Sequence, residues 1–386
     1  MTEVVIAGIG QVPVGEHWDI SMRSLAARAI LAARKDANGL KPQALYVGNF
    51  LGPMVSHQSN LGTLLAQNAG LEGVEAFTIE AAGASGAGAF RMGYLAVSSG
   101  YVDTALVVGV EKYTDMIGPG LEHYIGMGMD YDYELMQGIT TASQAALLMQ
   151  RYLYESKAPR EAFAEFSLSA HANGAHNPYA MYRKAIKLET YERAEIVSSP
   201  LNMFDIAPYA DGAAAVILTR SELVRPSELE KMVRVTGSSV VIDRLSLHDR
   251  PDPLAFEAAG LSVEQACRQA GILPKDVDFF ELSDAYSIFA VLSLEAAGFA
   301  KRGEAWKLAQ SGAFRLKGEL PISTMGGLKA RGNPLAATGV YQVVEAVQQL
   351  RGQSGANQVA GARRALVQSL GGPASTAITH VLERCT

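Results

Sequence analysis

Apolar residues along the chain follow two different spacings, and the two alternate. Residues 4–7 and 44–47 are short apolar runs of the kind that forms strands, whereas residues 23–34 place leucine, isoleucine and alanine on one face of a helix. Residues 86–99 predict a second helix, made of small and apolar residues, which leads into a strand at 105–108. Such alternation predicts an α/β fold in which helices cover a mostly parallel sheet.

The second half of the chain repeats this order of elements. A β-branched run at 233–241 precedes a helical pattern at 263–270 and a strand at 277–282. A helix at 338–350 then leads into a strand at 365–367, as the helix at 86–99 does in the first half. The order therefore predicts an internal duplication, with chance similarity between two α/β segments as the alternative.

The first helix of each half ends with the same local signal. Gly39 is followed three residues later by Pro42, and Gly271 by Pro274. Glycine followed by proline is a helix stop, because glycine adopts the left-handed conformation and proline does not continue the helix. We predict an N-terminal half at residues 1–225 and a C-terminal half at residues 226–386.

A long insert, residues 111–199, lies within the N-terminal half. It contains a stretch rich in glycine, methionine and tyrosine at residues 118–133. Loops longer than about 12–15 residues usually have a function, and methionine adapts to irregular apolar surfaces. The stretch fits a lid over an apolar ligand and a contact between subunits equally well.

Composition and charge narrow the class of protein. The chain has 33 Lys and Arg residues against 39 Asp and Glu, a net charge of −6, which gives no support to binding nucleic acid. Two cysteines, Cys267 and Cys385, and seven histidines lack the spacing of a metal site, so we expect no metal. The sequence has no signal-peptide pattern and no apolar run long enough to span a membrane. We expect a cytoplasmic protein with no membrane partner.

Three stretches have the composition of a site. Residues 80–89 are small and open a helix, where free N–H groups favour negative charge, although close helix packing would explain them as well. Residues 281–286 follow a strand and include Asp284, either a site residue or a helix cap. Residues 325–339 form a glycine-rich loop with Asn333, whose amide both donates and accepts hydrogen bonds.

These stretches resemble the thiolase superfamily, most of all its branch of sterol-carrier-protein-x-type and acetyl-CoA acetyltransferase-like proteins. The matching motifs occur in order along essentially the whole chain: EAAGASGAGA from Glu80, NPYA from Asn177, YADGAAAV from Tyr209 and MGGLKARGNPLAATG from Met325. The resemblance implies a duplicated thiolase fold with five α-β-α-β-α layers, mixed sheets and a long loop insert.

The chain departs from this family at the positions that carry its chemistry. Gly83 stands where thiolases have the nucleophilic cysteine, and Asn333 where they have the histidine that activates it. Ser283 takes the first position of the family's Asn-Glu-Ala-Phe or His-Asp-Ala/Cys-Phe motif, and neither cysteine of the chain falls at a family cysteine position. Because glycine has no side chain to attack a thioester, we expect ordinary thiolase turnover to be absent.

The resemblance then implies an acyl-CoA protein that acts without a covalent acyl-cysteine. Carbon–carbon bond cleavage or formation of the retro-aldol type is the first expectation, since N–H groups near Gly83 and the Asn333 amide would stabilise an enolate. Ser283, Asp284 and Tyr286 are candidates for proton transfer. Cysteine-less relatives of the aldolase type carry tyrosines where this chain has Ser283 and Asn333, so their catalytic residues do not carry over.

Two other functions stay open from the sequence. One is a non-catalytic acyl-CoA-binding or scaffold subunit, and the other is an acyltransferase with an unrecognised nucleophile such as Ser85. Ser85 is also a candidate contact for coenzyme A, and Arg183, Lys184 and Lys187 are candidates for its phosphates, with a solvated helix face as the alternative. We expect no covalently bound cofactor, since coenzyme A is part of the substrate. The resemblance also implies a homodimer and a small partner protein with an OB fold and a zinc ribbon.

Overall fold

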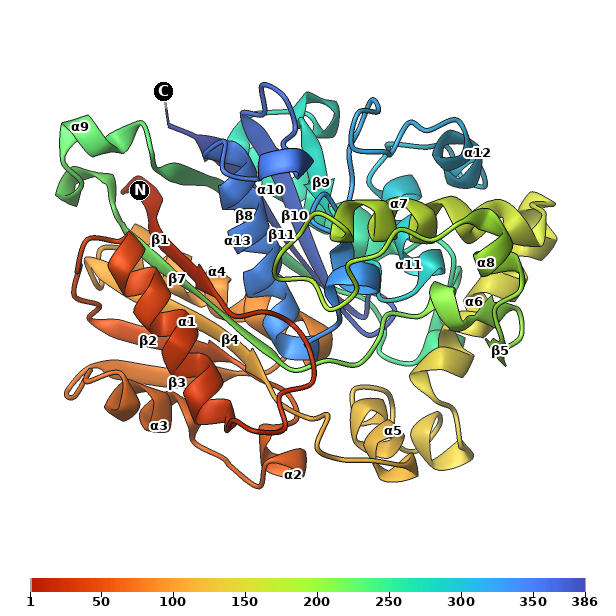
Figure 1. Ribbon diagram of the computed structural model, residues 1–386, viewed down its shortest axis with the longest axis horizontal. Coiled ribbons are helices and arrows are strands. Elements are labelled where there is room, and N and C mark those ends of the chain that lie inside the picture. The colour runs from red at the N-terminus through yellow and green to blue at the C-terminus, as the bar shows by residue number, and fades with distance from the viewer. Residues whose placement is uncertain (1, 386) are drawn as a thin grey trace.

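The computed structural model describes residues 2–385 and contains a nine-stranded mixed sheet (Figure 1). In spatial order the strands are β3, β2, β4, β7, β1, β8, β11, β10 and β9. Their bounds are β1 (Val4–Gln11), β2 (Ala44–Gly48), β3 (Glu75–Ile79), β4 (Thr104–Glu111), β7 (Gly212–Arg220), β8 (Val233–Ile242), β9 (Phe279–Glu281), β10 (Arg364–Gly371) and β11 (Thr376–Arg384). A separate ribbon consists of β5 (Ile196–Ser198) and β6 (Leu201–Asn202).

The strand pairing confirms the predicted duplication. In the first half β2 pairs parallel with β4, β4 antiparallel with β7, and β7 antiparallel with β1. In the second half β9 pairs parallel with β10, β10 antiparallel with β11, and β11 antiparallel with β8. The halves join through β1 and β8, where Val5 faces Arg234 and Ile6 faces Val233.

Four helices complete a five-layered arrangement. They are α1 (Met22–Asp36), α4 (Ser85–Ser98), α10 (Glu257–Ala270) and α13 (Thr338–Leu350). Helix α1 packs on β1 and β7, and α10 packs on β8 and β11, whereas α4 and α13 pack on each other and on strands of both halves. The layers are therefore α1, the first half of the sheet, α4 with α13, the second half of the sheet, and α10 (Figure 1).

Close approach of α4 to the 3₁₀ turn Leu335–Ala337, which leads into α13, explains much of the small-residue stretch at 80–89. A Cβ atom on Gly86 would lie 2.5 Å from the carbonyl oxygen of Ala336, so any larger residue would push the two segments apart. Gly39 and Gly271, the two predicted helix stops, have φ angles of 79° and 69°. Both adopt the left-handed conformation that ends a helix.

Helix α10 begins earlier than its predicted start at residue 263. Its first turns bury the small side chains of Ala258, Ala259 and Ser262, which give almost no hydrophobic periodicity in the sequence. The remaining helices outside the insert are α2 (Gly52–Val55), α3 (Leu61–Asn68), α9 (Pro226–Leu229), α11 (Ser287–Ala296) and α12 (Ala305–Gln310). No helix within residues 2–385 is both long and apolar enough to cross a bilayer.

The insert is more helical than the sequence indicated. It contains α5 (Pro119–Gly126), α6 (Thr141–Ser156), α7 (Ala164–Gly174) and α8 (Leu188–Glu192). The stretch 118–133, expected as an open loop, consists of α5 and a turn in which Asp130 accepts a hydrogen bond from the Tyr133 N–H at 2.9 Å. The sequence did not indicate this helix, because the stretch is rich in glycine and tyrosine and both residue types have low helix propensity.

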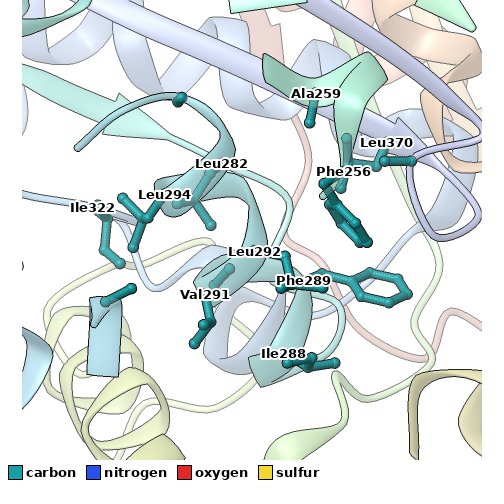
Figure 2. Packing of buried hydrophobic residues seen from close by; sticks show 14 of the residues in the cluster. Phe256, Ala259, Leu282, Ile288, Phe289, Val291, Leu292, Leu294, Ile322 and Leu370 are labelled. Atoms are coloured by element: carbon teal, nitrogen blue, oxygen red, sulfur yellow. The ribbon is translucent and has the colours of Figure 1, made fainter. Parts of the chain in front are cut away.

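The core of the second half reaches the region where the insert meets the sheet. Figure 2 shows Ile288, Phe289, Val291 and Leu292 of α11 among the buried side chains of this core. The rings of Phe256 and Phe289 lie 5.7 Å apart between centroids. This packing holds the N-terminal end of α11 rigidly beside the candidate site described next.

Candidate active site

A cavity lies where the two halves of the fold meet the insert. Its apolar walls include Phe50 after β2, Ile125 and Met129 of the insert, Phe289 of α11 and Leu335. The centre of a water molecule can occupy about 80 Å³ of this space. Because a single water needs about 10–15 Å³ by that measure, the cavity has room for roughly five to eight non-hydrogen atoms.

Polar side chains are few in this cavity and come from four segments. They are Thr141, Gln144, Tyr209, Ser283, Tyr286, Asn333 and Thr338. Of the candidates from the sequence, the structure therefore brings Ser283, Tyr286 and Asn333 together with Gly83, which also lines the cavity. Among residues 2–385, no Asp, Glu, His, Lys, Arg or Cys side chain lines it.

Gly83 lies in a 3₁₀ helix, Ala82–Ala84, that continues directly into α4. The first N–H groups of a helix have no partner inside it, and together they carry a partial positive charge. A Cβ atom on Gly83 would lie 2.8 Å from the carbonyl oxygen of Leu370. The Ala82 N–H donates to Glu80 Oε1 at 2.6 Å and the Ala84 N–H to Ala81 O at 3.0 Å, so the backbone donor left at this position is the Gly83 N–H. A side chain here would require the backbone around Leu370 to shift.

The Asn333 side chain presents a hydrogen-bond donor to the cavity. Its Oδ1 accepts from the Leu335 N–H at 3.1 Å and from the Thr338 hydroxyl at 3.4 Å. Because the Leu335 N–H can only donate, this contact fixes the orientation of the amide, and Nδ2 has no partner within residues 2–385. The backbone is also held, since Asn333 N–H donates to Pro208 O at 3.0 Å and its carbonyl accepts from Tyr113 Oη at 2.6 Å.

Tyr286 and Ser283 lie on the loop between β9 and α11. The Tyr286 hydroxyl donates to Thr141 Oγ1 at 2.9 Å, which links this loop to the insert. Burial raises the pKa of Tyr286 above the ordinary range of tyrosine. Ser283 lines the cavity, and its hydroxyl has no hydrogen bond to another atom within residues 2–385. Tyr286 is thus a neutral donor at neutral pH.

Asp284 does not line the cavity, although its neighbour Ser283 does, and its part in proton transfer stays a prediction. Its Oδ1 accepts from the Leu328 N–H at 2.7 Å and its Oδ2 from the Ser323 hydroxyl at 3.1 Å. Burial raises the pKa of this carboxyl, and Lys329 opposes the rise. Asp284 holds the π-helical turn Gly327–Arg331, so it acts on the loop that carries Asn333.

Ser85 also lies outside the cavity. Its hydroxyl donates to the Ala82 carbonyl at 2.6 Å and accepts from the Ala81 N–H at 2.9 Å, and its side chain is fully buried. These contacts stabilise the turn that presents Gly83. The hydroxyl is therefore occupied, and it is unsuited both as a nucleophile and as a contact for coenzyme A.

Arg183, Lys184 and Lys187 are exposed and lie on the segment after α7. This segment is tied to the Asn333 loop, because Met181 N–H donates to Arg331 O at 3.0 Å and Tyr182 N–H donates to Ala330 O at 2.9 Å. None of the three cations lines the cavity itself. Their role at the phosphates of coenzyme A stays a prediction.

Neither cysteine of the chain lies in the cavity. Cys267 belongs to α10, and Cys385 follows β11. Both are buried, and burial raises the pKa of each thiol to about 11. Since a thiolate is the nucleophilic form, both side chains are unreactive as well as remote.

A buried network of ionic side chains supports the loop that carries Asn333, which follows the turn Gly327–Arg331. Arg331 and Glu345 are both less than 2% exposed, and Arg331 Nη1 lies 2.7 Å from Glu345 Oε2. Glu281 accepts from the Thr324 N–H at 2.9 Å. Burial raises the pKa of Glu281 to about 7 and that of Glu345 to about 8, and Arg331 lowers both. The network anchors the loop through α13 and β9.

Sequence reasoning missed several cavity residues. Phe50 is placed by Glu111, whose carboxylate accepts from the Phe50 N–H at 3.1 Å and from the Asn49 amide at 2.8 Å. Tyr209 belongs to one of the motifs noted in the sequence. Its place at the cavity follows from a backbone bridge between Tyr209 and Asn333, which the sequence does not show. The sequence could have shown where α6 begins, because Thr140 caps it. It could not have shown that the Gln144 side chain of this helix lines the cavity.

Comparison with known proteins finds relatives along the whole chain. An acetyl-CoA acetyltransferase from Methanothermobacter thermautotrophicus is 37% identical over 386 residues and covers 100% of both chains. A 17-hydroxy-3-oxo-4-pregnene-20-carboxyl-CoA lyase from Mycobacterium tuberculosis is 29% identical and covers 95% of each chain. The solved structure of an Ltp2-ChsH2(DUF35) aldolase superposes with a TM-score of 0.84, at 24% identity, over 99% of this chain and 98% of that chain.

Two family models account for nearly all of the chain. The model described as the thiolase N-terminal domain matches residues 4–222, and the model described as thiolase C-terminal domain-like matches residues 239–384. The duplicated sheet, the five layers and the cavity between the two halves agree with these matches. The chain belongs to the thiolase family.

Proposed function

We propose that this protein binds a short acyl-CoA and cleaves or forms a carbon–carbon bond beside its thioester, by retro-aldol chemistry and without a covalent acyl-enzyme. One observation carries the proposal: the cavity presents hydrogen-bond donors for a thioester oxygen, yet neither cysteine of the chain reaches it. A 3-hydroxyacyl-CoA is the substrate class that this chemistry requires, because its cleavage gives a carbonyl compound and a thioester enolate.

The donors act on the charge that develops during cleavage. Asn333 Nδ2 has no other partner within residues 2–385, and Gly83, which lines the same cavity, lies in the first turn before α4. When the Cα–Cβ bond breaks, its electron pair moves toward the thioester oxygen. Fixed donors stabilise that charge more than water does, because they need no reorganisation.

The comparisons support this reaction class in part. The lyase from Mycobacterium tuberculosis is named for cleavage of a CoA ester and covers 95% of this chain. The acetyl-CoA acetyltransferase relative favours acyl transfer instead, and that second candidate needs a nucleophile. Ser85, the candidate from the sequence, is engaged in two hydrogen bonds outside the cavity.

We further propose that the protein forms a homodimer and works with a small partner protein. β3 is an outer strand of the sheet, and Phe77 on it is 58% exposed, as expected for an edge that a second chain covers. The solved aldolase with the similar fold carries a second component in its name. A non-catalytic subunit is the outcome to consider if turnover is absent both alone and with such a partner.

The decisive experiment is a substrate panel. We expect release of a carbonyl compound and a shorter acyl-CoA from short 3-hydroxyacyl-CoA esters, and no cleavage of acetoacetyl-CoA by free coenzyme A. The Asn333→Leu variant keeps the number of side-chain heavy atoms but removes the Nδ2 donor together with the Oδ1 acceptor for the Leu335 N–H, and we expect its kcat to fall by about 10²–10³-fold. Robust thiolysis, or unchanged cleavage by Asn333→Leu, would overturn the proposal.

A further inference from the structure

Retro-aldol cleavage needs a base for the proton of the β-hydroxyl group. Carboxylates and imidazoles supply this function in most enzymes, but no such side chain within residues 2–385 lines the cavity. The two titratable side chains that do line it are the tyrosines 209 and 286. These two hydroxyl groups are therefore the titratable groups of the cavity that could take the proton.

Tyr209 is the one connected to a carboxylate. Its hydroxyl donates to Glu122 Oε1 at 2.6 Å, and Glu122 lies in the first turn of α5 in the insert. Tyr209 and Asn333 form a parallel backbone bridge, so the phenol and the thioester-binding amide are carried by adjacent backbones. The Tyr113 ring packs edge-on against Tyr209, with 5.8 Å between ring centroids, and fixes its orientation.

We propose that Tyr209 is the catalytic acid–base residue of this site and that Glu122 receives the proton through it. The inference rests on the proposed function, and it assigns a task to the insert, which brings the carboxylate to a cavity that otherwise lacks one. Glu122 does not touch the substrate and is a positioning residue that also holds the transferred proton.

The proton and electron movements balance without another reactant. The O–H bond of the β-hydroxyl breaks, its proton moves to Tyr209 Oη, and the phenolic proton moves to Glu122 Oε1. The oxygen electron pair forms the new carbonyl, the Cα–Cβ bond breaks, and its electron pair becomes the enolate held by Asn333 Nδ2. Reversal of the relay returns the proton to Cα, which yields the carbonyl product and the shorter acyl-CoA.

The properties of the two tyrosines favour Tyr209 over Tyr286. Burial raises the pKa of both, and for Tyr209 the neighbouring Tyr286 and Glu122 raise it further. A free phenolate is therefore not formed near neutral pH, and a tyrosine serves as a base only when it passes its own proton on at the same time. Tyr209 passes it to a carboxylate, whereas Tyr286 donates to the Thr141 hydroxyl, which is not a base.

The experiment compares Tyr209→Phe and Glu122→Gln with the unaltered protein, using the short 3-hydroxyacyl-CoA that it cleaves fastest. Phenylalanine keeps the ring contacts of Tyr209, and glutamine still accepts the Tyr209 hydrogen bond but takes up no proton. We expect kcat to fall by about 10²–10⁴-fold in both variants, the usual contribution of a positioned acid or base. The Kd for the acyl-CoA product, measured by calorimetry, should stay within a few-fold.

Tyr124→Phe is the matched control, because Tyr124 is on α5 and does not line the cavity. Its kcat should equal that of the unaltered protein. Cleavage that persists in Tyr209→Phe, or a Glu122→Gln variant as active as the unaltered protein, overturns the relay and leaves the proposed function standing. Absence of cleavage by the unaltered protein across the whole panel overturns both.

Discussion

At the scale of single residues, the Gln144 side chain has a fixed orientation beside the cavity. Its Nε2 donates to Glu134 Oε1 at 3.0 Å, and because a carboxylate only accepts, this contact fixes the amide. Glu134 is itself held by the Leu247 N–H at 2.9 Å. Gln144 Oε1 has no partner within residues 2–385, so Gln144 presents an acceptor to the cavity that it lines.

We therefore predict a preference for acyl groups that carry a hydroxyl donor. Gln144→Leu should lower the ratio of affinities for a hydroxyacyl-CoA and its deoxy analogue by about 2–12-fold, the value of one neutral hydrogen bond of about 0.5–1.5 kcal/mol. Competition binding with the two esters measures the ratio. Gln150→Leu, at an exposed position of the same helix, is the control and should leave it unchanged.

A second prediction at the scale of single residues concerns the three exposed cations after α7. Charge reversal of Arg183, Lys184 and Lys187 to Glu should raise KM for CoA esters, and more so at low salt, because exposed charges are screened beyond about 10 Å at 0.1 M salt. The corresponding pantetheine esters lack the nucleotide phosphates and should show no change. An equal effect on both ester types would remove these residues from phosphate binding.

At the scale of elements, the turn Gly327–Arg331 determines where the site donor lies. Asp284 holds its N-terminal end, and Arg331 holds its C-terminal end through Glu345 of α13. The Arg331 guanidinium also lies over the Tyr341 ring, 5.2 Å from its centroid. Asn333 follows two residues later, so the buried network fixes the position of the Asn333 amide.

Removing one partner of the buried Arg331–Glu345 pair should lower the stability of the fold more than removing both partners does. We expect Glu345→Leu to destabilise the fold by about 3–5 kcal/mol, because it leaves the buried Arg331 charge unpaired. The double variant Arg331→Met with Glu345→Leu should recover much of that loss. Urea unfolding of the three proteins measures the difference, and equal destabilisation by the single and double variants would contradict it.

At the scale of the whole molecule, buried titratable groups shape the dependence of stability on pH. Burial raises the pKa of Glu111 to about 8 and that of Glu281 to about 7. Both groups bind protons more tightly when folded, so stability falls as pH rises from about 4.5 toward 7–8. Burial lowers the pKa of His171 to about 4 and that of His380 to about 3, so stability falls as pH drops below about 6.5.

The two effects oppose each other only between about pH 4.5 and 6.5, and we expect the free energy of unfolding to be highest there. Each group changes this energy by at most about 1.4 kcal/mol per pH unit. Chemical denaturation between pH 4 and 8.5 tests the curve. In His380→Gln the loss on the acid side should be shallower than in the unaltered protein, and an unchanged slope would show that His380 does not contribute.

Sequence by itself determined the repeated order of strands and helices, the two glycine stops, the family and four of the cavity positions: Gly83, Ser283, Tyr286 and Asn333. These features are local, since periodicity, helix-ending signals and motifs are written in consecutive residues. Only the tertiary structure decided that Asp284 and Ser85 hold backbone turns, that Tyr209 and Gln144 line the cavity, and that Glu122 accepts a hydrogen bond from Tyr209. Those roles depend on contacts between residues far apart in the chain, and residue type alone does not specify which polar groups meet.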